Sequence, residues 1–210
     1  MGGLFLDPAT QPYLMAEAGT GYFKKSFEPS QIKPEMANIT VVKSNAGPAW
    51  GAVYWQYEED MQKITEAQSP LQIKRKIFIE KITGQGKELV LVNGNIIPKI
   101  GDKLVIRIEI STDRDLEYVH LKDSRAAALE PIEQISGYQW RNGLGYYQSM
   151  KDASANFFFS YLPKGSYVFE YPLRASQKGV FSSGISTIQC YYAPEFAGHS
   201  EGIVLEVSEN

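Results

Sequence analysis

Apolar and polar residues alternate along most of the chain beyond residue 70, with the period of two that is typical of β-strands. In 104–110, for example, Leu and Ile occupy every second position, and Val, Arg and Glu lie between them. Turn residues interrupt the alternation, such as Gly101-Asp102 and the segment 162–165 with its Pro and Gly. The pattern predicts strands at 73–79, 89–92, 104–110, 116–121, 156–161, 166–174, 184–192 and 202–207.

The first 57 residues carry a separate group of strand signals. Segment 38–43 is rich in β-branched residues, and segment 49–57 places large aromatic residues on both of its faces. Aromatic residues on both faces favour a strand that is covered on both sides. Residues 44–48 (Ser-Asn-Ala-Gly-Pro) are predicted to form a turn, so that the two segments would pair as a hairpin. The polar stretch 58–70 has no clear period and is predicted to be a linker.

Helical signals are few. Only the short stretch 126–129 is compatible with a helix, and Pro131 would end it. Strands at regular spacing, without helices between them, predict an all-β chain built from antiparallel sandwich-type modules. A length of 210 residues leaves room for two such modules.

The composition is that of an ordinary globular protein, with 43% hydrophobic and 21% charged residues. The 21 basic and 24 acidic residues are interspersed, and because no basic stripe results, we expect no nucleic-acid partner. The sequence contains neither a long apolar stretch nor an N-terminal export signal. The chain is therefore expected either to stay in the cytosol or to be a piece whose export signal lies elsewhere.

Few residues are suited to catalysis or metal binding. His120 and His199 have no second His or Cys at ligand spacing, so we expect neither a metal site nor a cofactor. Cys190, the only cysteine, lies in a predicted strand and is expected to be a buried core thiol. A hydrolase based on a Cys190–His199 pair would need an electropositive, partly open setting, which the sequence does not indicate.

An aromatic cluster near residue 140 supports a different function. Trp140, Tyr146 and Tyr147 could line a sugar-binding face, which makes a carbohydrate- or cell-surface-binding module the alternative hypothesis. The same residues are also typical of a packed hairpin.

Eight segments resemble the C-terminal region of bacterial α2-macroglobulins, in the branch common among gut Bacteroidetes. The longest is Pro-Ala-Trp-Gly-Ala-Val-Tyr-Trp-Gln-Tyr at 48–57, and another is Tyr-Leu-Pro-Lys-Gly at 161–165. The segments cover almost the whole chain in the order expected for the family: 17–22, 48–57, 119–123, 125–127, 136–138, 156–158, 161–165 and 192–195.

The resemblance implies a layout and a function. Residues 1–64 would be the strands that follow a thioester domain, an incomplete half-module, and residues 65–210 would be the terminal macroglobulin domain, a fibronectin-like sandwich. The chain would be a non-catalytic portion of a broad-spectrum, protease-trapping inhibitor of the periplasm or cell envelope. Its partners would be the other domains of the parent chain and, through the full-length protein, the target proteases.

In this family an internal Cys–Gln thioester is shielded from water until a protease cuts the molecule. The chain has no Cys-Gly-Glu-Gln-type motif, so Cys190 is not the thioester cysteine. The resemblance makes Tyr192 the residue that covers the thioester, with Tyr191 where many relatives carry Met. Strand alternation predicts that Tyr191 and Tyr192 point to opposite faces, so that one should point inward and the other outward.

An incomplete module would expose strand edges and apolar surface. We therefore expect the chain either to dimerise through residues 1–64 or to donate these strands to the second domain.

Overall fold

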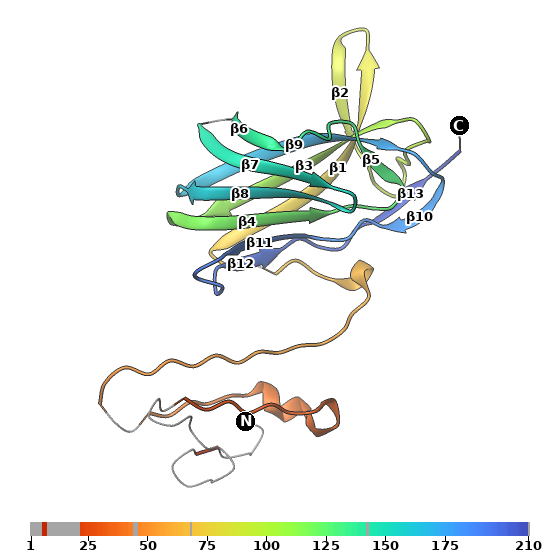
Figure 1. The fold of residues 1–210 in the computed structure, drawn as a ribbon. Coiled ribbons are helices and arrows are strands. Elements are labelled where there is room, and N and C mark those ends of the chain that lie inside the picture. The colour runs from red at the N-terminus through yellow and green to blue at the C-terminus, as the bar shows by residue number, and fades with distance from the viewer. Residues whose placement is uncertain (1–5, 8–21, 44–45, 68, 142, 210) are drawn as a thin grey trace. The chain divides into compact units, whose positions relative to one another are not determined.

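The computed structural model describes residues 6–7, 22–43, 46–67, 69–141 and 143–209. The chain consists of two compact units, residues 1–56 and residues 57–210. All strands of the described residues belong to the second unit (Figure 1). The module boundary at residue 64, which the family resemblance implies, stays a prediction.

The described part of the first unit contains two short 3-10 helices, η2 (Pro29–Gln31) and η3 (Pro34–Ala37). A proline begins each of them, because its fixed φ suits the first helical position and its missing N–H would have no partner there. Met36 is the buried residue of this stretch. A single buried side chain indicates that the described part of this unit has almost no apolar core of its own.

The strands predicted at 38–43 and 49–57 do not form among the described residues. Their large side chains are exposed, to 84% for Val41 and 90% for Trp50. An isolated hairpin is at best marginally stable in water, because it buries too little apolar surface. The sequence patterns of 38–43 and 49–57 therefore do not produce strands, because no apolar surface is present among the described residues for these segments to cover. Ser44 and Asn45 of the predicted turn lie outside the described residues.

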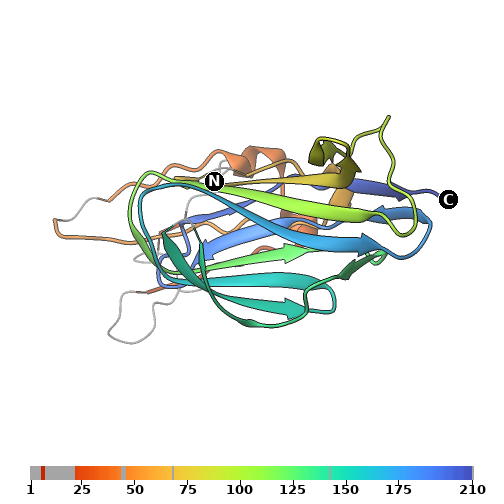
Figure 2. The ribbon, with the colours of Figure 1, turned by 90° about the horizontal axis from the view of Figure 1, so that it is seen from above.

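The second unit is a sandwich of two antiparallel sheets (Figures 1 and 2). The first sheet has the strand order β2-β1-β3-β9-β5. Its members are β1 (Leu71–Thr83), β2 (Gly86–Leu91), β3 (Lys103–Thr112), β5 (Leu129–Pro131) and β9 (Gly165–Ala175). Since β1 pairs with β3 only as far as Ile79, the tip of the β1–β2 hairpin projects beyond the sheet (Figure 1).

The second sheet has the strand order β12-β11-β4-β8-β7-β6 and lies in front of β1, β3 and β9 in Figure 1. Its members are β4 (Leu116–Ser124), β6 (Gly137–Arg141), β7 (Leu144–Lys151), β8 (Ser154–Leu162), β11 (Ser186–Cys190) and β12 (Ala197–His199). Two further strands, β10 (Gly179–Ser182) and β13 (Val204–Val207), pair with each other.

The prediction of an all-β sandwich is confirmed. Each of the eight strands predicted beyond residue 70 overlaps an observed strand, and 162–165 is the turn that carries the chain from β8 into β9 and the other sheet. The helix-compatible stretch is a turn instead, closed by a hydrogen bond of 3.0 Å from Leu129 N–H to the Ala126 carbonyl oxygen. Five strands were not predicted: β5, β6, β7, β10 and β12.

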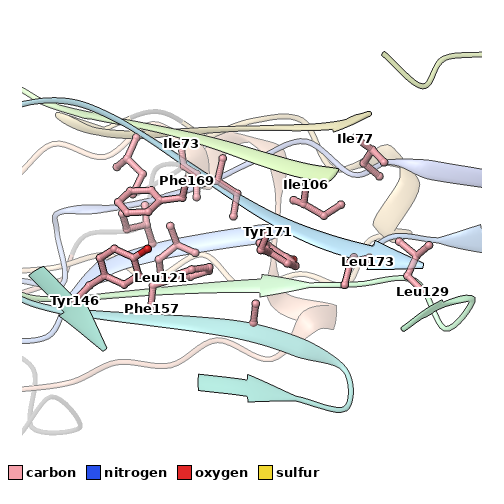
Figure 3. Packing of buried hydrophobic residues seen from close by; sticks show 14 of the residues in the cluster. Ile73, Ile77, Ile106, Leu121, Leu129, Tyr146, Phe157, Phe169, Tyr171 and Leu173 are labelled. Atoms are coloured by element: carbon pink, nitrogen blue, oxygen red, sulfur yellow. The ribbon is translucent and has the colours of Figure 1, made fainter. Parts of the chain in front are cut away.

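Apolar side chains from both sheets fill the space between them (Figure 3). Phe157 of the second sheet packs against Phe169 of the first, with ring centroids 5.9 Å apart, and Tyr146 lies 5.2 Å from the same Phe169 ring. Leu121 and Ile106, one from each sheet, are fully buried. This continuous apolar layer holds the two sheets together. It therefore fixes which side of each sheet faces the core and which side faces outward.

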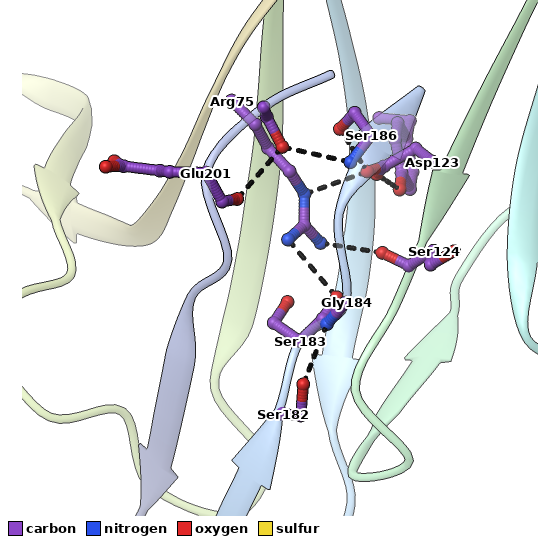
Figure 4. A network of polar contacts seen from close by, with 10 residues as sticks. Arg75, Asp123, Ser124, Ser182, Ser183, Gly184, Ser186 and Glu201 are labelled. Carbon is purple, nitrogen blue, oxygen red and sulfur yellow. Dashed lines mark hydrogen bonds and ion pairs between the residues drawn. The ribbon is translucent and has the colours of Figure 1, made fainter. Parts of the chain in front are cut away.

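A buried ion pair crosses this core (Figure 4). Arg75 Nε on β1 lies 2.8 Å from Asp123 Oδ1 on β4, and both side chains are 0% exposed. The Arg75 guanidinium also donates to the carbonyl oxygens of Ser124, at 2.9 Å, and Ser183, at 3.2 Å. An unpaired charge in the interior would cost several kcal/mol, so these bonds favour one arrangement of β1 against β4.

The Asp123 carboxylate is also satisfied from both sheets. It accepts hydrogen bonds from the hydroxyls of Ser186, at 2.6 Å, and Tyr171. Burial, and secondarily the charge of Asp123, raise the pKa of Tyr171 well above its ordinary value. The phenol therefore stays protonated and can keep donating its hydrogen bond.

Part of the predicted linker packs on the sandwich. Ala67 exchanges backbone hydrogen bonds with His199 of β12, and Gly202 N–H donates to the Ile64 carbonyl oxygen at 2.9 Å. A Cβ on Gly202 would collide with the Met61 carbonyl oxygen of helix η4 (Met61–Lys63), so only glycine fits there. The prediction of a linker over 58–70 is wrong for this stretch, because polar side chains do not prevent a backbone from pairing with a sheet edge.

Candidate interaction surface

A row of mostly aromatic residues crosses the outer face of the six-stranded sheet. Strand register defines it: Gln189, His120, Phe158, Tyr147 and Tyr138 are successive partners across β11, β4, β8, β7 and β6. Residues directly opposite one another in antiparallel strands point to the same face. The neighbours of these residues along each strand are mostly buried, so the row lies on the face turned away from the core.

The rings in this row contact one another. His120 stacks on Phe158 with centroids 4.6 Å apart, and Phe158 lies 6.4 Å from Tyr147. Tyr147 meets Tyr138 edge to face at 5.1 Å, and Tyr191 extends the row on the other side at 6.1 Å from His120. Such pairs are stabilising beyond their burial alone, so the row is a connected aromatic surface.

A second row lies beside the first. Trp140 is paired with Gly145, and a Cβ at Gly145 would be 2.8 Å from the Trp140 ring, so glycine leaves room for the indole to lie across β7. Tyr118 and Tyr192 meet edge to face, with centroids 5.2 Å apart. Together the two rows form a surface that we call the outer aromatic face: Tyr118, His120, Tyr138, Trp140, Tyr147, Phe158, Tyr191 and Tyr192.

Strand β4 changes face at Tyr118. Leu116 and Val119 are both buried, although strict alternation would place them on opposite faces. Tyr118 has a φ of 53°, in the left-handed region that residues with a Cβ rarely adopt. Strand β8 changes face at the same level, since Phe159 and Leu162 are both buried. The sequence prediction of regular alternation through 116–121 is therefore wrong at Tyr118.

Tyr191 and Tyr192 follow β11 directly, and both are exposed, to 63% and 81% respectively. The prediction that they point to opposite faces is wrong, because β11 ends at Cys190 and alternation ends with it. Tyr192 has the exposure that its suggested role requires. The role itself stays a prediction.

Of the three residues suggested for a sugar-binding face, Trp140 and Tyr147 lie on the outer aromatic face and Tyr146 does not. Tyr146 is 3% exposed, and its ring lies 5.7 Å from that of Phe159 in the core. Burial raises the pKa of the Tyr146 hydroxyl. Placing Tyr146 on the surface was wrong because it occupies an inward position of β7. The packed hairpin, formed by β6 and β7, is confirmed.

The structure separates Cys190 from His199. Cys190 is buried, and its thiol donates to the Glu117 carbonyl oxygen at 3.1 Å, which confirms the predicted core thiol. His199 is the register partner of the exposed Thr187 and therefore lies on the other face of the sheet, with Nδ1 3.1 Å from the Ser200 carbonyl oxygen. The two side chains do not form a nucleophile–base pair.

His199 instead lines a cavity of about 440 Å³ together with Glu58, Glu59 and Glu66. In the part of the chain that the structure describes, no group of three or more His, Cys, Asp or Glu side chains is placed to hold a metal ion. No described helix is long and apolar enough to span a membrane. The outer aromatic face is therefore the strongest candidate site.

The family model of the bacterial alpha-2-macroglobulin MG10 domain matches residues 71–195, which include the five-stranded sheet, the six-stranded sheet except for β12, and the whole outer aromatic face. This chain belongs to the bacterial alpha-2-macroglobulin family. The family predicted from the sequence is confirmed. The Bacteroidetes branch stays a prediction.

Solved alpha-2-macroglobulin structures share the fold. A mutant of the Salmonella protein aligns with a TM-score of 0.54 at 16% identity, over 69% of this chain and 10% of that chain. Escherichia coli alpha-2-macroglobulin, from domain MG7 to the C-terminus, aligns with a TM-score of 0.52 at 14% identity, over 68% of this chain and 24% of that one. At such identities the likeness shows the fold alone.

A curated relative, circularly permutated Ras protein 2 of Dictyostelium discoideum, is 22% identical over 108 residues. The match covers half of this chain and 3% of that protein. The chain thus spans only a small part of the length of each protein that it resembles.

Proposed function

We propose that this alpha-2-macroglobulin chain is the non-catalytic C-terminal portion of a longer protease-trapping protein, called the parent below. Residues 65–210 would be its terminal macroglobulin domain, and residues 1–64 would complete a module shared with a thioester domain. The match to the MG10 family model and the alignment with the E. coli protein from domain MG7 to the C-terminus support this placement.

The outer aromatic face is the observation that carries the proposal. Soluble domains seldom expose a contiguous apolar patch of this kind unless it is an interaction site. Tyr, Trp and Phe are also the residues enriched at the centres of protein interfaces. We infer that this face packs against another domain of the parent, as the terminal domain of a multidomain trap must do.

Tyr192 is the residue that we propose to cover the thioester. An ester-like bond survives only where water is excluded, and a tyrosine ring offers a broad apolar surface with a hydroxyl that can orient it. Tyr192 lies at the edge of the outer aromatic face, where its ring contacts only Tyr118 among the aromatic residues that the structure describes. Most of the ring is therefore left for a partner.

The experiment is a comparison of Tyr192→Ala with Ile82→Ala in the parent. Ile82 is 85% exposed but lies near the tip of the β1–β2 hairpin, outside the outer aromatic face. Amine-reactive protein is followed over time by intact mass after methylamine treatment. We expect Tyr192→Ala to lose reactivity several-fold faster than wild type and Ile82→Ala to match wild type.

Equal rates for Tyr192→Ala and wild type would refute the covering role. A wild-type parent that forms no methylamine adduct would refute it as well, since no thioester would be present to cover.

A carbohydrate-binding module remains the second candidate, because Trp140 and Tyr138 are highly exposed on the edge strand β6. A glycan array separates the two functions. Robust sugar binding that is lost in Trp140→Ala would favour the second candidate over the interdomain surface.

The location and assembly of the protein belong to the same proposal. We propose that the parent works in the periplasm or cell envelope.

We also propose that the isolated chain dimerises through residues 1–64. The exposed aromatic side chains of 49–57 support dimerisation, because they need a partner surface. Analytical ultracentrifugation of the chain with and without residues 1–56 checks it, and a monomer in both cases would contradict it.

A further inference from the structure

Tyr118 combines a strained backbone with contacts to both candidate tyrosines. It is the single non-glycine residue with a positive φ among the described residues. A left-handed conformation brings Cβ close to the following carbonyl oxygen, so it persists only where surrounding contacts hold it. The contacts made by Tyr118 therefore indicate which interactions hold its backbone in the strained conformation.

Two successive carbonyl groups of β4 fasten the chain at the end of β11. The Glu117 carbonyl oxygen accepts from the Cys190 thiol at 3.1 Å, and the Tyr118 carbonyl oxygen accepts from the Tyr191 N–H at 2.9 Å. Just beyond these bonds, the Tyr192 ring meets the Tyr118 ring at 88°, an edge-to-face contact. The bend at Tyr118 thus supplies both a backbone anchor and a ring contact at the site where β11 ends.

We propose that Tyr118 is the positioning residue for Tyr192: its left-handed backbone directs the carbonyl to Tyr191 and its ring holds the Tyr192 ring outward for the partner domain. The inference rests on the proposed function, since Tyr192 is the residue being positioned. Tyr118 itself contacts no reacting atoms.

Three substitutions separate the ring from the backbone. Tyr118→Phe keeps the ring, Tyr118→Ala removes the ring but keeps a Cβ, and Tyr118→Gly removes both the ring and the strain. Tyr138→Ala is the matched control, because Tyr138 is an exposed tyrosine of the same face that contacts Tyr147 instead of Tyr192.

The readout on this chain is ¹⁹F NMR after 3-fluorotyrosine labelling, with the Tyr192 signal assigned by its loss in Tyr192→Phe. We expect the Tyr192 signal to keep its ring-current shift in Tyr118→Phe and Tyr138→Ala, and to move to the free-tyrosine position in Tyr118→Ala and Tyr118→Gly. In Tyr118→Gly the Tyr191 amide should stay protected from hydrogen exchange, because the backbone anchor is retained. A Tyr192 signal that Tyr118→Ala leaves unmoved would overturn the proposal.

A measurement on the wild-type chain covers the case in which a variant fails to fold. The rings of Tyr118 and Tyr192 should show a proton–proton NOE, and its absence would equally overturn the proposal.

The parent then links position to function. Tyr118→Ala should speed the loss of amine reactivity to the same extent as Tyr192→Ala, and the double variant should be no faster than either, because residues that act as a unit are not additive. If Tyr192→Ala has no effect in the parent while the NMR results hold, the proposed function fails and the positioning role stands. Additive effects in the double variant would overturn the functional coupling of Tyr118 to Tyr192.

Discussion

Both faces of the six-stranded sheet carry aromatic residues, but these residues have different partners on the two faces. Tyr146 and Phe157 point into the core, and their neighbours Tyr147 and Phe158 point outward from the same strands. On the inner face every aromatic ring has partners from the opposite sheet, as Phe157 has in Phe169. On the outer face the described ring–ring contacts stay on one side of a single sheet.

This difference separates folding from function. The inner face is explained by the sandwich itself, because its residues are buried when the two sheets meet. The outer aromatic face adds little to the sandwich, since its rings keep much of their surface in water. Exposing aromatic side chains to water is unfavourable, and folding of the sandwich does not require it here. The outer aromatic face is therefore the surface on which we expect the function.

Among substitutions on the inner face, Asp123→Ala should cause the largest loss of stability. It leaves Arg75 buried with an uncompensated charge, so we expect a loss of about 3–5 kcal/mol in the free energy of unfolding, or failure to fold. Glu170→Ala, which breaks the exposed Arg107–Glu170 pair, is the control and should cost about 1 kcal/mol or less. Urea titration followed by circular dichroism measures both. Equal small losses would show that the buried pair does not hold the sheets together.

Phe157→Ala and Phe158→Ala compare the two faces at adjacent positions. Phe157→Ala should cost about 3–5 kcal/mol, because it opens a cavity between the sheets. Phe158→Ala should cost about 1 kcal/mol, the value of its ring contacts on a partly exposed surface. The same urea titration serves, and comparable losses at the two positions would contradict the division into a folding face and a functional face.

Tyr171→Phe tests the hydroxyl that completes the Asp123 site. Removing one donor from the buried carboxylate should cost about 1–3 kcal/mol near neutral pH. Because the folded-state pKa of Tyr171 is raised, the folded protein keeps a proton that the unfolded chain loses above about pH 10. The stabilisation is fully present below that pH and is lost as the pH rises further.

Thermal unfolding between pH 8 and pH 11 checks this sign. Wild type should lose stability with rising pH more steeply than Tyr171→Phe. Parallel profiles would rule out Tyr171 as the source of the alkaline loss.

Tyr192→Ala should have the smallest effect on the stability of the isolated chain, within about 0.5 kcal/mol, because the side chain is exposed and its one aromatic contact within the described part of the chain is to Tyr118. A loss of 2 kcal/mol or more, on the order of a core substitution, would make Tyr192 a structural residue of the sandwich.

Sequence patterns sufficed wherever one strand face is fully buried. In β3 the isoleucines at even positions are all buried, because one side of the strand lies against the core along its whole length, and Val105 on the other face is buried as well. The same reasoning failed for 38–43 and 49–57, since alternation states what a strand would bury but not whether a surface is present to receive it. It also failed at Tyr118, whose left-handed backbone depends on contacts with the end of β11.

The candidate site could be predicted only in part. Trp140, Tyr147, Tyr191 and Tyr192 were named from the sequence. His120, Phe158 and Tyr138 join them only through strand register, which pairs residues far apart in the chain, and Tyr118 joins through its ring contact with Tyr192. The sequence pattern indicates the buried ion pair only weakly. Arg75 and Asp123 are opposite charges at inward positions of alternating strands, and only the packing of β1 against β4 shows that they meet.

The most direct test of the central claim is hydroxyl-radical footprinting of the same residues in this chain and in the parent. If the outer aromatic face packs on another domain, Trp140, Phe158 and Tyr192 should be oxidised several-fold more slowly in the intact parent than in the isolated chain. Val180, which is exposed on β10 outside this face, should be oxidised at the same rate in both. Equal oxidation of Trp140, Phe158 and Tyr192 in the two proteins would contradict the account.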